Sequence, residues 1–349
     1  MKRIRLYIVL MVVLSLLGGC GVSPKEIDLQ NAALGVIETK GNKKESRIIV
    51  YDNRMNAVGA LNLPYASMGN TFSKTLTHSG GLYVVPQGYF NKKDEKKVLR
   101  INLQTLKVKE FDIDQIAIND VAVSDDDIYT SSNLNYVSYI RKLNGKTGRS
   151  SEVELPRVYV SHIAFIKNRL YAFGSEIKDN GRTYIYIYDE NLALIKSVDI
   201  TAVGMDQYDS VVYGNEILFA SLVDVNDEST DFVAAFDMND YNIRKIPLGE
   251  NNVFEVSVDG DNLYVSHFDA VHGGDSASLS VVHLASGKMT QSDLKHGAEQ
   301  MLVRDSKIYF LSNWKLYSYN LRDMKQIGER KIEVMDHDYS YLSGMFSFY

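Results

Sequence analysis

Several features that would identify an enzyme are missing from this sequence. The 349 residues include one cysteine, Cys20, so no disulfide can form within one chain. The chain contains no Gly-x-Ser-x-Gly elbow, no His-Glu-x-x-His segment and no phosphate-cradling glycine loop. Helical periodicity is also missing after residue 20, which argues against helical folds. On this evidence no catalytic residue is predicted.

The most hydrophobic run of the chain is too short to cross a bilayer. It covers residues 6–17, interrupted by Tyr7 and Ser15, whereas a spanning helix needs roughly 20 apolar residues. A basic start, "MKRIR", precedes it, as in secretory signal peptides. The run ends in "LGGC" (17–20), which resembles the lipobox of bacterial lipoproteins.

This resemblance implies that residues 1–19 are a signal peptide and that Cys20 is lipidated on sulfur. Residues 20–32 would then be the lipidated N-terminus and a short tether. A diacylglyceryl group supplies two acyl chains, enough for stable anchoring. We therefore expect an extracytoplasmic protein that is lipid-anchored to the cell membrane. The alternative is an uncleaved signal anchor with an incidental cysteine.

The charge of the chain argues against nucleic acid as a partner. The net charge is −6, and removal of Lys2, Arg3 and Arg5 with the signal peptide lowers it by three, to −9. An acidic domain is repelled by phosphate backbones and by anionic membrane faces.

One short aromatic pattern recurs through the rest of the chain. Copies such as "GGLYVV" (80–85), "NRLYAF" (168–173) and "DNLYVS" (261–266) are short strands that follow a polar turn. Successive copies are 46, 42, 47, 46 and 45 residues apart. The aligned positions are Tyr83, Tyr129, Tyr171, Leu218, Tyr264 and Tyr309. So narrow a period is typical of a repeat architecture.

Each copy lies in a longer unit of four short strands, of which the third ends in a polar residue. Seven positions of this kind count the units: Asp52, Asn102, Asn144, Asp189, Asp237, His283 and Asn320. The pattern predicts an all-β fold, a seven-bladed β-propeller with four-stranded antiparallel blades. A solenoid of this period would need helices or a much shorter β repeat.

The two ends of the chain together complete one blade. Residues 33–63 supply three strands, and "GMFSFY" (344–349) supplies the missing innermost strand. We therefore expect residues 33–349 to form a single propeller domain, closed by pairing of N- and C-terminal strands. Closure leaves no open sheet edge.

Two turns carry a resemblance to a known group of propellers. "KLNGKTGR" (142–149) and "HLASGK" (283–288) are similar to the Asp-x-x-Thr-Gly-Lys turn of quinoprotein-like repeats, and the blades resemble Tyr-Val-Thr-Asn repeat proteins. The resemblance concerns fold, because these motifs are turn chemistry with glycine at positive φ. Quinone-binding relatives dock their blades with a tryptophan after this turn. This chain has only Trp314, which is elsewhere, so no quinone or other cofactor is predicted.

Polar residues are expected around one mouth of the central channel. The positions nine residues before each aligned position are all polar: Lys74, Asp120, His162, Asp209, Glu255 and Gln300. Like charges crowded there would raise one another's pKa unless a cation relieved them. They form either a ligand-binding ring or the ordinary polar lining of a water-filled channel.

A second candidate site is the loop "HFDAVHGGD" (267–275). His267, Asp269, His272 and Asp275 are residue types that bind zinc or a hard cation, so a divalent cation is possible here. Gly273 and Gly274 make a helical arrangement of the histidines improbable. The acidic loop 224–231 lacks the glycine and terminal glutamate of an EF-hand loop and is better explained as a solvated turn.

Two function hypotheses follow. The first is a non-catalytic envelope lipoprotein, a monomeric disc whose top face binds a protein, peptide or glycan. The second is a metal-assisted hydrolase or lyase with its site at the channel mouth, where His162, His267 and Glu255 would be the first candidates. The abundant aromatic residues, 23 Tyr and 13 Phe, favour strand packing, and some could form a sugar or peptide platform.

Overall fold

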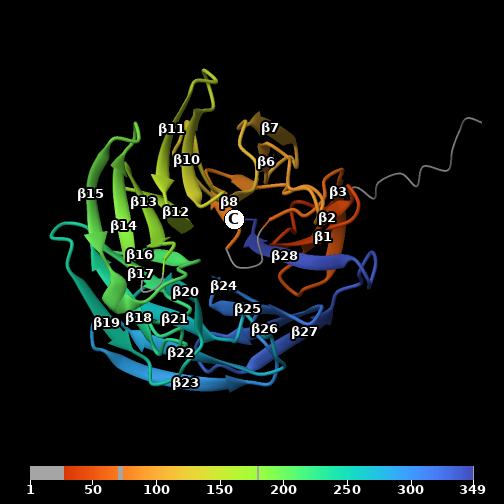
Figure 1. Cartoon of the computed structure of the whole chain (residues 1–349). Coiled ribbons are helices and arrows are strands. Elements are labelled where there is room, and N and C mark those ends of the chain that lie inside the picture. Colours follow the sequence, from red (N-terminus) through yellow and green to blue (C-terminus); the bar gives the residue numbers. More distant parts are fainter. Residues whose placement is uncertain (1–26, 70–73, 179–180, 349) are drawn as a thin grey trace, which may run out of the picture.

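The computed structural model describes residues 27–69, 74–178 and 181–348, and it is a seven-bladed β-propeller. Seven four-stranded antiparallel sheets surround a central channel like the blades of a fan (Figure 1). The described residues include one short 3₁₀ helix, Thr201–Val203, between two blades. The fold class predicted from the sequence is confirmed.

The strands follow one another from the channel outward in every blade. Blade 1 consists, in this order, of β28 (Ser340–Ser347), β1 (Leu34–Lys40), β2 (Ser46–Tyr51) and β3 (Ala57–Leu63). Blade 2 consists of β4 (Leu76–His78), β5 (Gly81–Val84), β6 (Lys97–Asn102) and β7 (Val108–Asp112). Blade 3 consists of β8 (Ile118–Val123), β9 (Asp127–Leu134), β10 (Val137–Asn144) and β11 (Ser150–Pro156).

The remaining four blades have the same order. Blade 4 consists of β12 (Val158–Ile166), β13 (Arg169–Glu176), β14 (Thr183–Asp189) and β15 (Leu194–Asp199). Blade 5 consists of β16 (Ser210–Tyr213), β17 (Glu216–Ala220), β18 (Phe232–Asp237) and β19 (Ile243–Pro247). Blade 6 consists of β20 (Val253–Asp259), β21 (Asn262–His267), β22 (Ala277–His283) and β23 (Lys288–Leu294). Blade 7 consists of β24 (Gln300–Arg304), β25 (Lys307–Ser312), β26 (Lys315–Asn320) and β27 (Gln326–Lys331).

The ring is closed as the sequence predicts, by pairing of β28 with β1. The register runs from Leu34 opposite Ser347 to Lys40 opposite Ser340, with a bulge at Ile37 and Glu38. β28 thus occupies the innermost place of blade 1, beside strands from the start of the chain (Figure 1). β1 begins at the end of the channel where β28 finishes, and it ends where β28 begins.

The repeated aromatic positions form the second strand of each blade. Tyr129, Tyr171 and Tyr309 have at most 2 % of their surface exposed, because strands one place out from the channel are covered on both faces by neighbouring blades. Tyr83, Leu218 and Tyr264 occupy the equivalent places and are also buried.

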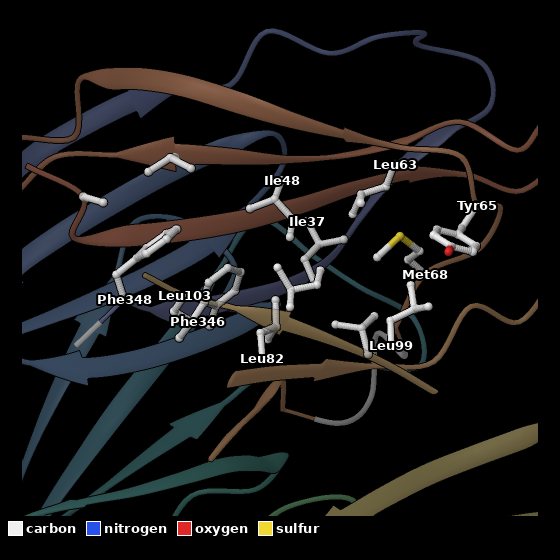
Figure 2. Packing of buried hydrophobic residues seen from close by; sticks show 14 residues of the cluster. Ile37, Ile48, Leu63, Tyr65, Met68, Leu82, Leu99, Leu103, Phe346 and Phe348 are labelled. Atoms are coloured by element: carbon white, nitrogen blue, oxygen red, sulfur yellow. The ribbon is translucent and has the colours of Figure 1, made fainter. Parts of the chain in front are cut away.

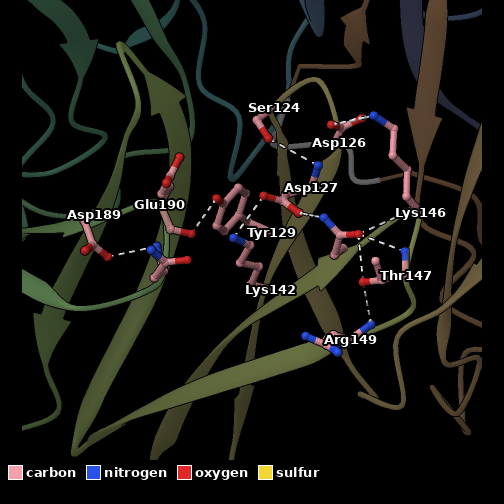
Figure 3. Close-up of polar contacts among 12 residues, drawn as sticks. Ser124, Asp126, Asp127, Tyr129, Lys142, Lys146, Thr147, Arg149, Asp189 and Glu190 are labelled. Atoms are coloured by element: carbon pink, nitrogen blue, oxygen red, sulfur yellow. Dashed lines mark hydrogen bonds and ion pairs between the residues drawn. The ribbon is translucent and has the colours of Figure 1, made fainter.

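The polar residue at the end of each third strand caps the turn to the fourth strand. In all six blades where it is Asp or Asn, its side-chain oxygen accepts the backbone N–H two residues later, as in an Asx turn. In the turn after β10, Asn144 Oδ1 accepts the Lys146 N–H at 3.2 Å and also the Thr147 N–H at 2.8 Å. Lys146, Thr147 and Arg149 of this turn are labelled in Figure 3. Gly148 follows with φ of 71°, as expected for this turn.

The hydrophobic cores lie between blades, one between each adjacent pair. In the core between blades 1 and 2, Phe346 and Phe348 pack with Ile37 and Leu82 (Figure 2). Gly35 is needed there, because a Cβ at this position would lie 2.2 Å from the Phe346 ring. The C-terminal strand therefore contributes side chains to the core as well as hydrogen bonds.

Residues 27–33, which include part of the expected tether, pack onto the ring. Ile27 and Leu29 contact the core between blades 1 and 2, and the Ala33 N–H donates to the Tyr51 carbonyl at 2.8 Å. The expected signal peptide and Cys20 lie outside the described residues. Within the described ranges, no helix is long and apolar enough to span a membrane.

Candidate functional site

The main candidate site is a cup at one mouth of the channel, with a volume of about 320 Å³. We call this the aromatic cup. It lies at the end of the channel where the innermost strands begin. Aromatic and small polar side chains line it: Ser67, Gln87, Phe90, Lys93, Asn119, Ser161, Tyr159, Tyr208 and Tyr341, together with Gly69. The volume is within the range of small-molecule binding sites.

Four rings from different segments form the aromatic part of the cup. Phe90, on the loop between β5 and β6, is 61 % exposed and stacks on Tyr341 of β28 with 6.0 Å between ring centroids. The Phe90 N–H donates to the Gly41 carbonyl at 3.0 Å, which fixes this loop to blade 1. Tyr159 and Tyr208 come from blade 4 and from the approach to blade 5. Burial raises the pKa of Tyr208 and Tyr341, so both phenols keep their protons.

The six polar positions expected at the mouth are on the innermost strands or directly before them, but they do not form an open ring. Asp120, Asp209, Glu255 and Gln300 are at most 8 % exposed. The side chains of Asp120, Asp209 and Glu255 accept hydrogen bonds from the next blade. The open, water-lined ring considered above is therefore not what these residues form.

Three acidic side chains make the same kind of contact, each with the blade that follows its own. Asp120 Oδ2 accepts the Ile163 N–H at 2.8 Å, and Asp209 Oδ2 accepts the Val256 N–H at 2.7 Å. Glu255 Oε2 accepts the Met301 N–H at 2.5 Å. In each case the donor is the residue that follows the equivalent position of the next blade. We call these contacts the inter-blade clamps.

Lys74 partly balances the buried negative charge. Its Nζ lies 2.6 Å from Asp209 Oδ2 and also donates to the Val256 carbonyl. Burial raises the pKa of Glu255 to about 8, the Lys74 ammonium opposes this, and the Asp209 carboxylate adds to it. Glu255 therefore holds a proton at neutral pH.

His162 makes the corresponding contact from blade 4 with its ring. Its Nδ1 lies 2.7 Å from Asp120 Oδ2, and its Nε2 lies 2.8 Å from the Ser210 hydroxyl. Three consecutive blades thus contribute an Asp, a His and a Ser in one line. Ser210 is not among the residues predicted from the sequence. The sequence does contain a signal for Ser210. The residue after the clamp position is apolar in blades 3, 4, 6 and 7, whereas blade 5 has this serine there.

The loop 267–275 does not bring its four candidate ligands together. His267 is buried, with Nδ1 3.0 Å from the Asn251 carbonyl and Nε2 2.8 Å from the Ser280 hydroxyl, and burial lowers its pKa. His272 is exposed and contacts Asp269 at 2.9 Å, whereas Asp275 pairs with Asn313. In the part of the chain that the structure describes, no three His, Cys, Asp or Glu side chains form a group able to hold a metal ion.

Fold and site together define a seven-bladed β-propeller with a ligand-sized cup at its channel mouth. No protein-family model matches the sequence, and no curated protein matches it.

Several solved structures are similar to this chain, and one of them is described as a β-propeller domain. The β-propeller domain of the trilobed protease from Pyrococcus furiosus is 15 % identical with a TM-score of 0.52, over 76 % of this chain and 84 % of that chain. Hsv2 from Kluyveromyces lactis is 12 % identical with a TM-score of 0.50, over 74 % and 81 %. AztD from Citrobacter koseri is 12 % identical with a TM-score of 0.48, over 90 % and 97 %. At these identities the likeness concerns the fold alone.

The Pyrococcus domain is described as having an open velcro topology. The ring of the present chain is instead closed by β28, which pairs with β1 over the length of both strands.

Proposed function

We propose that the protein is a lipid-anchored binding protein of the cell envelope whose aromatic cup binds a glycan. The observation that carries the proposal is the composition of the cup, which combines four aromatic rings with neutral polar side chains. The lipobox-like "LGGC" at residues 17–20 supports the envelope location.

The chemistry of the lining favours a sugar over other ligands. Aromatic rings present flat apolar faces with polar edges, which match the C–H faces and hydroxyl groups of a sugar. Gln87, Asn119 and Ser161 supply neutral donors and acceptors, which match hydroxyl groups better than they match charged ligands. Lys93 is the one charged residue of the described lining, and no carboxylate lines the described cup, so cationic ligands are disfavoured.

Replacement of Tyr159 by alanine should weaken glycan binding roughly tenfold to thirtyfold, because an aromatic contact in a binding site contributes about 1.4–2 kcal/mol. Tyr159 lines the cup and is 36 % exposed. The measurement is a glycan-array screen followed by isothermal titration of the glycans that bind.

Tyr136→Ala is the matched control, because Tyr136 is 74 % exposed and does not line the cup. Its affinity should equal that of the unaltered protein. If peptides but no glycans bind in a Tyr159-dependent manner, the ligand class is wrong and the site is right. Equal binding by both variants would reject the cup as the site.

Replacement of Cys20 by alanine should abolish lipidation and release the protein from the membrane fraction. Anchoring by acyl chains depends on about 0.8 kcal/mol for each buried methylene, so loss of the diacylglyceryl group removes the main attachment. The measurement is metabolic labelling with palmitate, combined with membrane fractionation. Retention of the label in Cys20→Ala would contradict the lipoprotein assignment.

A further inference from the structure

Next to lining residues of the aromatic cup along the chain, three side chains from blades 3, 4 and 5 form a hydrogen-bonded line. Asp120 Oδ2 lies 2.7 Å from His162 Nδ1, and His162 Nε2 lies 2.8 Å from Ser210 Oγ. Asp120 is buried, the His162 side chain is 13 % exposed, and Ser210 is half-buried. Distances of this size are those of a nucleophile, its base and the group that orients the base.

The hydrogen bonds around Asp120 determine where the protons lie. Its carboxylate accepts the Val121 N–H at 2.8 Å and the Ile163 N–H at 2.8 Å, in addition to the contact with His162. An ionised carboxylate only accepts hydrogen bonds, so His162 Nδ1 must carry the proton that it donates to Asp120. In the neutral ring Nε2 is then an acceptor, and it faces the hydroxyl that a base would activate.

The residues of the line are close neighbours in sequence of residues that line the cup. Asn119 and Ser161 line the cup and directly precede Asp120 and His162, and Tyr208 lines it two residues before Ser210. A strand rises roughly 3.3 Å per residue, so the backbone of these three residues lies within one or two residues of the cup lining.

A second Ser–His pair in the same ring has a different setting. His267 Nε2 contacts the Ser280 hydroxyl at 2.8 Å, but its Nδ1 faces the Asn251 carbonyl instead of a carboxylate. Ser280 is 0 % exposed. This pair is a buried structural contact and provides an internal comparison for the hydrogen-bonded line.

We propose that Ser210 is a nucleophile for carboxylic esters, with His162 as its general base and Asp120 as the residue that positions His162. The substrate class is an acyl ester whose carbonyl group enters the channel from the cup. This activity goes beyond ligand binding, and its test does not depend on which ligand the cup prefers.

The reaction balances with water as the second reactant. Ser210 Oγ bonds to the carbonyl carbon while its proton passes to His162 Nε2. The bond from that carbon to the alcohol oxygen then breaks, and the alcohol leaves with this proton. Water attacks the acyl-serine and gives a proton to Nε2, the acid is released, and Ser210 recovers its proton.

The test uses the purified full chain, a fluorophosphonate probe and p-nitrophenyl acetate. We expect one probe per chain, located on Ser210 by mass spectrometry. Ser210→Ala should lose the label and lower hydrolysis at least about 100-fold, because it removes the nucleophile that His162 would activate. Ser280→Ala should retain both. His162→Ala should label slowly and recover in part with added imidazole.

The role of Asp120 is tested against an equivalent clamp. Asp120→Asn should slow labelling, since the amide favours the wrong imidazole tautomer, and Asp120→Glu should restore part of the rate. Glu255→Gln alters a clamp without contacting a histidine and should label normally. Melting temperatures identify variants that fail to fold. The proposal would be overturned if the folded, unaltered protein did not react with the probe, or if labelling persisted in Ser210→Ala. The hydrogen-bonded line would then be only a structural contact between blades.

Discussion

Deletion of residues 344–349 should unfold the entire ring in a single transition. The deletion removes half of β28 and leaves β1 with an unpaired edge next to the channel. It also removes Phe346 and Phe348, which are 2 % and 1 % exposed in the core between blades 1 and 2. Loss of one buried phenylalanine side chain costs about 3–5 kcal/mol. Two such losses approach the about 5–15 kcal/mol that stabilises a typical domain.

The measurement is urea denaturation followed by near-ultraviolet circular dichroism. Phe346→Ala alone should lower the free energy of unfolding by about 3–5 kcal/mol. Phe90→Ala is the control, since Phe90 is 61 % exposed, and it should change that free energy by no more than about 0.5 kcal/mol. A truncated protein that denatures at the same urea concentration as the full chain would show that ring closure does not depend on β28.

Stability should fall as the pH rises from about 4.5 to about 8, because of Glu255. Its pKa is about 8 in the folded protein, whereas the ordinary pKa of a glutamate, which applies to the unfolded chain, is 4.5. Between these values the folded protein holds a proton that the unfolded chain has lost, so each pH unit costs about 1.4 kcal/mol. The contribution is favourable below pH 4.5 and is lost above pH 8.

Replacement of Glu255 by glutamine should flatten this part of the pH dependence. The amide stays neutral, so the variant should resemble the unaltered protein at about pH 4.5 and be more stable by a few kcal/mol at about pH 9. The measurement is urea denaturation at several pH values. Gln300→Ala is the control, since Gln300 occupies the equivalent position of the next blade without a titratable group, and it should shift stability equally at each pH. Parallel curves for Glu255→Gln and the unaltered protein would exclude a buried proton at this site.

The repeat made the fold readable from sequence. Seven blades give seven copies of one local environment, so the same residue types recur at the same places. Tyr171 and Tyr309 recur because each second strand is buried between blades. Asn144 and Asp189 recur because each turn after a third strand needs a side-chain acceptor. Ring closure was predicted because the second-strand pattern has six copies and the third-strand pattern has seven, so that one blade has to be completed by the two ends of the chain.

The aromatic cup could not be read in this way. Phe90 lies on a loop and Tyr208 precedes an innermost strand, whereas Tyr159 and Tyr341 are each the second residue of one. No single spacing therefore relates the four rings. They meet only because the loops of several blades converge on one mouth. Glu255 shows a second limit. Its position in the repeat was predictable. The direction of its side chain was not, because that depends on the Met301 N–H of the next blade.

The direction in which β1 enters the ring has a consequence for orientation. Leu34, the first residue of β1, pairs with Ser347, whereas Tyr341 of the cup lies toward the other end of β28, roughly 20 Å away along the strand. If Cys20 carries the lipid that we propose, the chain enters the ring at the face opposite the cup, and this would leave the cup pointing outward. Such a protein would capture material from the surroundings or from an adjoining layer, and not the headgroups of the bilayer that carries it.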